Sequence, residues 1–114
     1  MNIALLGAGK TGSQIIELHK KTDVFTSSNP PELSSLSQSD VIISFLPGEA
    51  FQKYMPLLIE SKKPVVTGST GFKWPRDIHE ELMTKKLKWI RAHNFSLGMN
   101  LVKSMIQIIS KANE

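Results

Sequence analysis

Three glycines near the N-terminus have the spacing of a phosphate-binding loop, Gly-x-Gly-x-x-Gly over residues 7–12. In such a loop Gly7 permits a tight turn, Gly9 lets the backbone approach a pyrophosphate, and Gly12 lets a helix pack closely on a strand. The free N–H groups and the positive dipole end of the following helix then stabilise the phosphate charge. The pattern predicts a dinucleotide-binding site. A glycine-rich connection that binds nothing is the plainer alternative.

A P-loop is a competing interpretation of the same residues, because Gly9-Lys10-Thr11 matches the end of that motif. The P-loop needs another glycine five residues before Gly9, and that position is Ala4. The loop is therefore too short to wrap a triphosphate. Asp40 begins a predicted strand instead of ending one, so it is not placed to hold magnesium either.

Short apolar segments alternate with segments of helical periodicity along the chain. Strands are predicted at residues 2–6, 23–26, 40–45, 64–67 and 87–92. Helices are predicted at residues 10–21, as a weak turn at 32–36, around 51–58 with Pro56 straining the middle, at 75–86 and at 97–112. This alternation is typical of βαβ units, so we expect a Rossmann-type α/β fold, an open parallel sheet of about five strands with helices on both faces.

Polar loops follow the third, fourth and fifth predicted strands, at residues 44–48, 68–72 and 93–96. Ligands of an open parallel sheet bind beyond the carboxyl ends of the strands, so these loops should converge with the glycine loop. The second strand ends in Thr26-Ser27-Ser28-Asn29, without the acidic residue that commonly binds the adenosine ribose. The absence of a carboxylate favours NADPH over NADH. No arginine supports that preference, and an ordinary Ser-rich turn is an equal alternative.

No side chain of the sequence stands out as a catalytic acid, base or metal ligand. His93 lies on a predicted loop but has no carboxylate close to it in sequence, so a packing role is favoured over proton donation. His19 and His79 fall on predicted helices, and the three histidines lack metal-ligand spacing. Trp74 and Trp89 are interpreted as packing residues, not as platforms for nucleic-acid bases.

The composition restricts the class of protein. With 114 residues, 40% of them apolar and 21% charged, the chain has room for one globular domain over residues 1–114. It has no cysteine and no secretory signal, which makes the cytoplasm the expected compartment. No apolar run approaches the roughly 18 residues of a membrane span. Ten of its 14 Lys and Arg residues fall in residues 62–114. We interpret this half as a solvated face, with a phosphate ligand preferred over nucleic acid as its charged partner.

Three motifs, in this order, resemble the N-terminal domain of the 4-hydroxy-tetrahydrodipicolinate reductase family, also called dihydrodipicolinate reductases, of lysine and diaminopimelate biosynthesis. They are the glycine loop, the Gly-Ser-Thr-Gly-Phe run at residues 68–72 and the Asn-Phe-Ser-x-Gly-x-Asn segment at residues 94–100, which is the specific one. The resemblance implies a homotetrameric oxidoreductase that uses NADH or NADPH to reduce a cyclic dihydrodipicolinate-type substrate. The motifs and the resemblance together predict cofactor contacts at Gly7, Ala8, Gly9, Lys10, Thr11, Gly12, Ser27, Ser28, Phe45, Gly68, Ser69, Thr70, Ala92, His93, Asn94 and Phe95.

The sequence departs from the family pattern in three ways. The glycine loop is one residue shorter than the family's Gly-x-x-Gly-x-x-Gly form, the acidic residue after the second strand is absent, and the substrate domain is missing. That domain carries the family's His-His pair, a lysine and an Asp-Ala-Pro-Ser-Gly-Thr run, which bind substrate and deliver the proton. We therefore expect a fragment that binds cofactor without turnover. A stand-alone nucleotide-binding or sensing module is the alternative.

The closing helix has a wide apolar face. On a helical wheel its apolar residues fill an arc of about 160°, wider than the ≳ 100° stripe that one packing surface needs. They are Leu101, Val102, Met105, Ile106, Ile108, Ile109 and Ala112. We expect the sheet to cover part of this arc and the remainder to be exposed or buried against another copy of the chain.

We predict that Gly9→Val abolishes cofactor binding and leaves the fold intact. The valine side chain would occupy the space through which the backbone approaches the pyrophosphate. A titration of NADH and NADPH against both proteins, with circular dichroism as the check on folding, measures the effect. Equal affinity of the two proteins would remove the glycine loop from the site.

Overall fold

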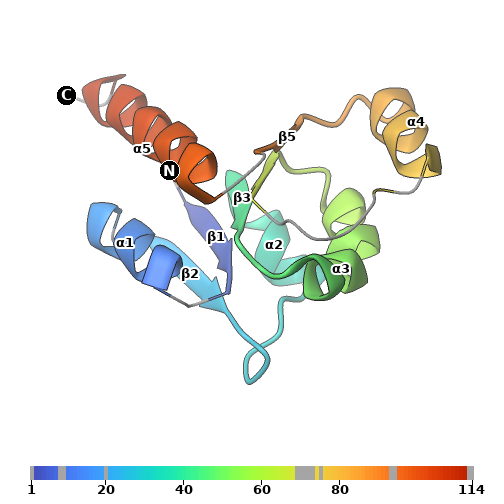
Figure 1. The fold of residues 1–114 in the computed structure, drawn as a ribbon, viewed down its shortest axis with the longest axis horizontal. Helices are drawn as coiled ribbons and strands as arrows, with labels where there is room; N and C mark the ends of the chain where they lie inside the picture. The colour runs from blue at the N-terminus through green and yellow to red at the C-terminus, as the bar shows by residue number, and fades with distance from the viewer. Residues whose placement is uncertain are drawn as a thin grey trace.

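The computed structural model of the protein describes residues 2–7, 10–19, 21–68, 74, 76–92 and 95–112. Strands and helices alternate along this chain, as Figure 1 shows. The strands are β1 (Ile3–Leu6), β2 (Thr22–Phe25), β3 (Val41–Ser44), β4 (Val65–Thr67) and β5 (Trp89–Arg91). The helices are α1 (Lys10–Leu18), α2 (Leu33–Ser37), α3 (Gly48–Ser61), α4 (Arg76–Thr84) and α5 (Phe95–Ala112).

The five strands form one parallel sheet in the order β2-β1-β3-β4-β5. β1 is hydrogen-bonded on both sides, with Leu5 opposite Val24 of β2 and Ile43 of β3. All four residues of β1 and all four of β3 are buried, as expected for strands whose two faces are both covered. The predicted Rossmann-type parallel sheet is confirmed.

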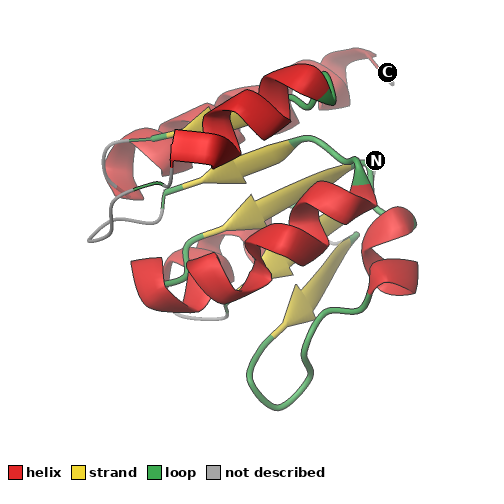
Figure 2. Cartoon of the chain, turned by 90° about the vertical axis from the view of Figure 1, so that its right-hand side faces the viewer, coloured by secondary structure: helices red, strands yellow, loops and turns green. Residues whose placement is uncertain are grey.

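Helices cover both faces of the sheet (Figure 2). Ile3 and Leu5 of β1 pack with Ile15 of α1 and Val102 of α5 in one buried cluster. The alternate residues of β1 belong to a second cluster, which contains Leu36 of α2 and the apolar side of α3. β1 therefore joins two cores, because successive side chains of a strand point to opposite faces.

α3 buries the apolar face that its spacing predicts. Phe51, Met55 and Leu58 are each at most 2% exposed, and Tyr54 is half-buried beside them. The helix continues through Pro56, whose ring is on the exposed side. It ends at Ser61, and the next residue, Lys62, takes a left-handed conformation with φ of 60°.

Several predicted boundaries were wrong by a few residues. The first helix ends at Leu18, not at residue 21, and the Thr22 hydroxyl donates a hydrogen bond of 2.6 Å to the carbonyl of His19 just beyond that end. The second strand was predicted to begin at residue 23, but β2 begins at Thr22, which pairs with Ile3. α4 ends at Thr84, before Lys86 adopts a φ of 56°. α5 begins at Phe95, two residues earlier than predicted.

The sheet covers only part of the apolar arc of α5, as predicted. Val102 and Ile106 are buried in the core with Met99, whereas Leu101 and Met105 are half-buried. Ile108 is 68% exposed. The side chains of Ile109 and Ala112 lie outside the described part of the structure.

Leu58→Ala should lower the free energy of unfolding by about 2–5 kcal/mol, because it opens a cavity in a fully buried position. Ile108→Ala is the control, and should change that free energy by no more than about 0.5 kcal/mol, since the side chain already contacts water. Urea denaturation followed by circular dichroism gives both values. Equal losses would mean that α5 is covered where the structure leaves it open.

Candidate functional site

The strand order places the switch point of the sheet at the carboxyl ends of β1 and β3, where a ligand crevice is expected. The chain passes from β1 to β2 on one side and then returns to β3 on the other side of β1. Because the connections after these two neighbouring strands run in opposite directions, they leave space between them. Ligands of open α/β sheets bind at such a point. The glycine loop follows β1 and the segment at residues 45–47 follows β3, so both predicted segments begin at this crevice.

Gly7 makes the turn that leaves β1. Its φ is +94°, a conformation that residues with a side chain rarely adopt. A Cβ atom at this position would lie 3.1 Å from Cδ2 of Leu46, in the segment that follows β3. The N–H of Gly7 donates a hydrogen bond of 2.9 Å to the carbonyl of Phe25, at the end of β2. The tight turn predicted for Gly7 is therefore present, and it joins the ends of three strands.

The first helix begins immediately beyond the loop. α1 starts at Lys10, so the backbone of Lys10, Thr11 and Gly12 forms its first turn, which contains no acidic residue. The first N–H groups of a helix lack partners within the helix and carry the positive end of its dipole. This end of α1 is at the same edge of the sheet as Gly7. It therefore has the electrostatic character that an anionic ligand needs.

The turn after β2 presents two serines. Thr26 and Asn29 exchange two backbone hydrogen bonds of 3.1 Å, and the Thr26 hydroxyl accepts a further bond of 3.3 Å from the N–H of Ser28. The Asn29 amide donates to the carbonyl of Val24 at 3.2 Å. Ser27 and Ser28 are therefore exposed at the tip of a closed turn. The predicted lack of a carboxylate in this turn stands.

Two residues beside this turn, Ser35 and Gln38, escaped the sequence analysis. A polar cavity of about 340 Å³ runs along the outer side of β2, lined by Asp23, Val24, Phe25, Asn29, Ser35 and Gln38. Asn29, Ser35 and Gln38 belong to the turn and to the region of α2, whose short helix gives little periodic signal in the sequence. Their approach to β2 depends on how the chain folds back.

The other predicted segments begin at the same edge. Gly68 is buried, and its N–H donates a hydrogen bond of 3.0 Å to the carbonyl of Ser44, at the end of β3. The N–H of Ala92 donates a hydrogen bond of 2.8 Å to the carbonyl of Thr67, at the end of β4. Phe45 follows β3, is partly buried, and packs against the core cluster that contains Val102 of α5. This helix begins at Phe95. The structure thus brings together the described members of the predicted set. Ala8, Gly9, Ser69, Thr70, His93 and Asn94 lie outside the described residues.

The described residues are equipped for binding and not for proton transfer. Among them, no group of three His, Cys, Asp or Glu side chains could hold a metal ion. His79 is exposed on α4, and His19 follows the end of α1 instead of lying within it. No described helix is long and apolar enough to cross a membrane. Within the described part of this edge, the available chemistry is that of backbone N–H groups, hydroxyls and a helix dipole.

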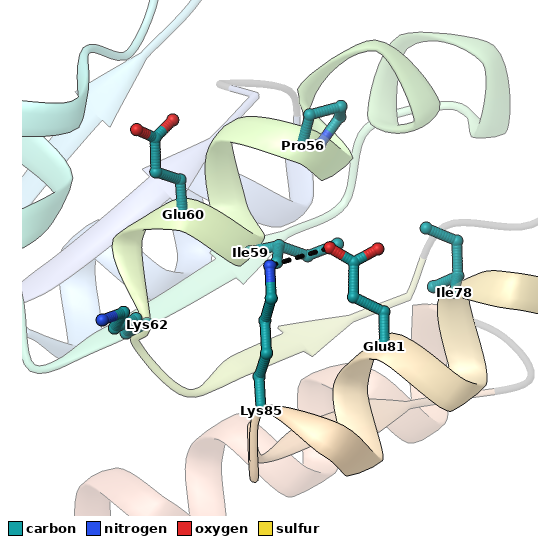
Figure 3. Close-up of a pocket in the computed structure, with 7 residues that line it drawn as sticks. All are labelled: Pro56, Ile59, Glu60, Lys62, Ile78, Glu81 and Lys85. Carbon is teal, nitrogen blue, oxygen red and sulfur yellow. Dashed lines mark hydrogen bonds and ion pairs between the residues drawn. The ribbon is translucent and has the colours of Figure 1, made fainter.

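A second cavity, of about 640 Å³, lies between α3 and α4 (Figure 3). Ile59 and Ile78 contribute apolar surface, and Lys85 forms an exposed ion pair of 2.9 Å with Glu81 at its rim. Lys62 at the end of α3 and Lys85 just after α4 mark the amino edge of the sheet. The glycine loop is at the carboxyl edge. This cavity is therefore separate from the site predicted for the dinucleotide.

Comparison with known proteins gives one family. The family model described as "Dihydrodipicolinate reductase, N-terminus" matches residues 19–95. The 4-hydroxy-tetrahydrodipicolinate reductase of Christiangramia forsetii is 38% identical over 109 residues, covering 89% of this chain and 45% of the relative. That of Syntrophus aciditrophicus is 30% identical over 76 residues, covering 67% of this chain and 28% of the relative. The chain therefore spans less than half the length of these two relatives.

Solved structures share the fold at low sequence identity. Aspartate semialdehyde dehydrogenase II from Vibrio cholerae aligns with a TM-score of 0.56 and 14% identity, over 79% of this chain and 37% of its own. A flavodoxin from the domain Archaea aligns with a TM-score of 0.55 and 15% identity, over 99% of both chains. Flavodoxins have the strand order 2-1-3-4-5, which is also the order found here. At these identities the likeness describes the fold alone.

We predict that Gly7→Ala lowers the free energy of unfolding by about 1–3 kcal/mol, because alanine is strained at a φ of +94°. The double variant Gly7→Ala/Leu46→Ala, compared with Leu46→Ala, removes the 3.1 Å contact and leaves only the backbone strain. Chemical denaturation of the four proteins gives the cycle. If alanine at position 7 costs nothing in either background, the turn does not require glycine.

Proposed function

The chain belongs to the dihydrodipicolinate reductase family, and from this premise we propose that it is the nicotinamide-dinucleotide-binding part of a reductase. The reaction proposed for the whole enzyme is hydride transfer from the nicotinamide ring to a cyclic dihydrodipicolinate-type substrate. The family model covers residues 19–95, more than half of the chain. The named relatives are reductases, but this chain spans less than half of their length, so substrate reduction is proposed for an enzyme of the relatives' full length.

The observation that carries the proposal is the Gly7 turn at the crevice between β1 and β3. Glycine adopts the φ of +94° without strain, a Cβ atom there would crowd Leu46, and the first turn of α1 follows directly. A backbone that turns this tightly into a helix start presents N–H groups to a pyrophosphate. The proposal therefore assigns the pyrophosphate to residues 7–12 and the adenosine ribose to Ser27 and Ser28.

The remaining half of the cofactor should extend across the other side of the crevice. With the adenosine at the end of β2 and the pyrophosphate at the end of β1, the strand order leaves the ends of β3, β4 and β5 for the nicotinamide. We assign it to Phe45, to residues 68–70 and to residues 92–95. Their described members offer backbone groups and an aromatic ring, which can orient a nicotinamide but supply no proton.

We assign the steps of the proposed reaction separately to the cofactor, to this domain and to a second domain. The bound cofactor supplies the hydride, and the protein supplies its position and the electrostatic environment. A ring imine that accepts a hydride also needs a positioned acid, and the described residues form no such pair of acid and partner. We therefore assign substrate binding and proton delivery to a second domain of the kind that the family carries.

The proposed preference for NADPH rests on the turn after β2, where two hydroxyls are exposed and no carboxylate is present. Ser27→Asp should weaken NADPH by about fivefold to tenfold and NADH by less, since a carboxylate beside a phosphate is repulsive. Ser104→Asp, at an exposed position of α5, makes the same change of charge away from the turn and serves as the control. Equal losses of the two cofactors in Ser27→Asp would separate Ser27 from the ribose.

The 114-residue chain should bind cofactor without turning over substrate. We expect steady-state oxidation of NADPH with a dihydrodipicolinate-type substrate to be at least about 10³-fold slower than for a two-domain relative assayed in parallel. Substrate positioning and a general acid each account for factors of this size. A rate within tenfold of the relative would show that the short chain holds a complete active site.

A further inference from the structure

The polar cavity on the outer side of β2 has the size and the lining of a ligand site. Its volume of about 340 Å³ is within the range of small-ligand sites, roughly 300–1,000 Å³. All of its lining residues fall in residues 21–68, which the structure describes without a gap. Four of them, Asp23, Asn29, Ser35 and Gln38, carry hydrogen-bonding groups on their side chains. The cavity therefore suits a small polar ligand.

The cavity lies at an open edge of the sheet. β2 is the first strand in the sheet order and pairs only with β1, so its other edge has no neighbouring strand. The side-chain amide of Asn29 donates a hydrogen bond of 3.2 Å to the carbonyl of Val24 in this strand. The bond fixes the Asn29 side chain against β2 and leaves its own carbonyl oxygen as an acceptor. The turn after β2 thus supplies one wall of the cavity.

Asp23 and Gln38 supply two further polar groups. Asp23 is two residues before Phe25 on β2 and therefore points to the same face of the sheet, the face that α2 covers. Gln38 directly follows α2, where its backbone N–H donates a hydrogen bond of 3.2 Å to the carbonyl of Ser35. Among the described residues, neither the Asp23 carboxylate nor the Gln38 side-chain amide is paired with another side chain. Both groups are exposed and free to bind a ligand.

The cavity continues the path proposed for the cofactor. That path crosses the strand ends from β3 to β1, where the pyrophosphate is assigned, and then to β2, where the ribose is assigned to Ser27 and Ser28. The sheet ends at β2, so the base that the ribose carries extends beyond its outer side. Asn29 closes the same turn as the two serines, through its bridge with Thr26, and also lines the cavity. The cavity is therefore next to the proposed ribose position.

The lining residues match the hydrogen-bonding edge of adenine. This edge has an amine donor at N6, with acceptor nitrogens on both sides of it. A carboxylate only accepts hydrogen bonds and pairs with an exocyclic amine of a base, whereas Asn and Gln amides both donate and accept and pair with adenine. Asp23, Asn29 and Gln38 are of these two kinds. Hypoxanthine has a carbonyl at C6 in place of the amine, so its oxygen would be repelled by a carboxylate.

We propose that this cavity binds the adenine base of the cofactor, and that the Asp23 carboxylate accepts a hydrogen bond from the N6 amine. The inference rests on the proposed function, which assigns the adenosine ribose to Ser27 and Ser28. Asp23 selects adenine over a purine that has a carbonyl at C6. Gln38, from the opposite wall, contributes a hydrogen bond to a ring nitrogen.

The test compares two ligands by isothermal titration calorimetry on the full chain. One is the reduced cofactor that wild type binds more tightly, NADH or NADPH, and the other is its analogue with hypoxanthine in place of adenine. Wild type should bind the adenine form about tenfold more tightly, the size of effect expected from one hydrogen bond to a charged group. Asp23→Asn should reduce this ratio to within about twofold, because an amide accepts from the amine and donates to the carbonyl equally well. The two ligands carry the same charge, so the ratio is independent of the charge that the variant removes.

Two further variants control for charge and for folding. Asp77→Asn makes the same chemical change at an exposed position of α4 and should keep the tenfold ratio. Gln38→Ala removes an amide that can pair with either base, so it should weaken both ligands about twofold to fivefold and leave their ratio unchanged. Circular dichroism checks the fold of each variant. Gln38→Ala decides the question if Asp23→Asn does not fold.

The outcomes separate this inference from the proposed function. If wild type binds both ligands within twofold of each other, or if Asp23→Asn keeps the ratio of wild type, the adenine is not read by Asp23 and the proposed function stands. Unchanged affinities in Gln38→Ala place the base outside the cavity and also overturn the inference. If wild type binds neither ligand, the proposed function is wrong and the inference is lost with it.

Discussion

The burial of β1 on both faces and both edges is the constraint on which the rest of the structure depends. β2 and β3 occupy its two edges, and α1, α5, α2 and α3 cover its two faces. A chain that leaves such a strand must turn at once to avoid the neighbouring connection. Gly7 makes that turn with a φ of +94°, and Leu46 stands where a side chain would go. The position of the crevice at the strand ends follows from the strand order, and the Gly7 turn lies beside it.

The two faces of the sheet have different relations to the predicted site. On one face, α1 brings its N-terminus to the crevice, and α5 lies over the core with Ile108 left in water. On the other face, α3 brings Phe51 against Trp74 and Trp89, with ring centroids 6.2 Å and 6.0 Å away. The groups proposed to bind the cofactor lie at one edge because the five strands are parallel.

Two separate lines support a dinucleotide-binding domain. The family model begins its match at residue 19, after the glycine loop, so the loop and the family match are different observations. The loop gives the chemistry of a phosphate site, and the family gives the reaction in which such a site would serve. The fold alone would not choose between them, since an archaeal flavodoxin aligns over 99% of this chain.

The sequence by itself determined the elements, because their signals are local. Apolar runs such as residues 40–45 and the helical spacing of Phe51, Met55 and Leu58 require only neighbouring residues to be recognised. The glycine pattern and the lack of a carboxylate in the Ser27-Ser28 turn are equally local. Boundaries were harder to predict. The second strand was expected to begin at residue 23, yet the pairing of Thr22 with Ile3, 19 residues earlier, makes Thr22 its first residue.

Tertiary structure decided everything that depends on residues far apart in the chain. The sheet order, the approach of Leu46 to Gly7, and the meeting of Phe51, Trp74 and Trp89 join segments with no mutual signal in the sequence. The prediction that the two tryptophans pack is confirmed. The sequence did not indicate which residues they would contact. Asn29, Ser35 and Gln38 gather beside β2 for the same reason. Burial of apolar area is non-directional, so the sequence shows which side chains seek the interior, and only the folded chain shows what each one meets there.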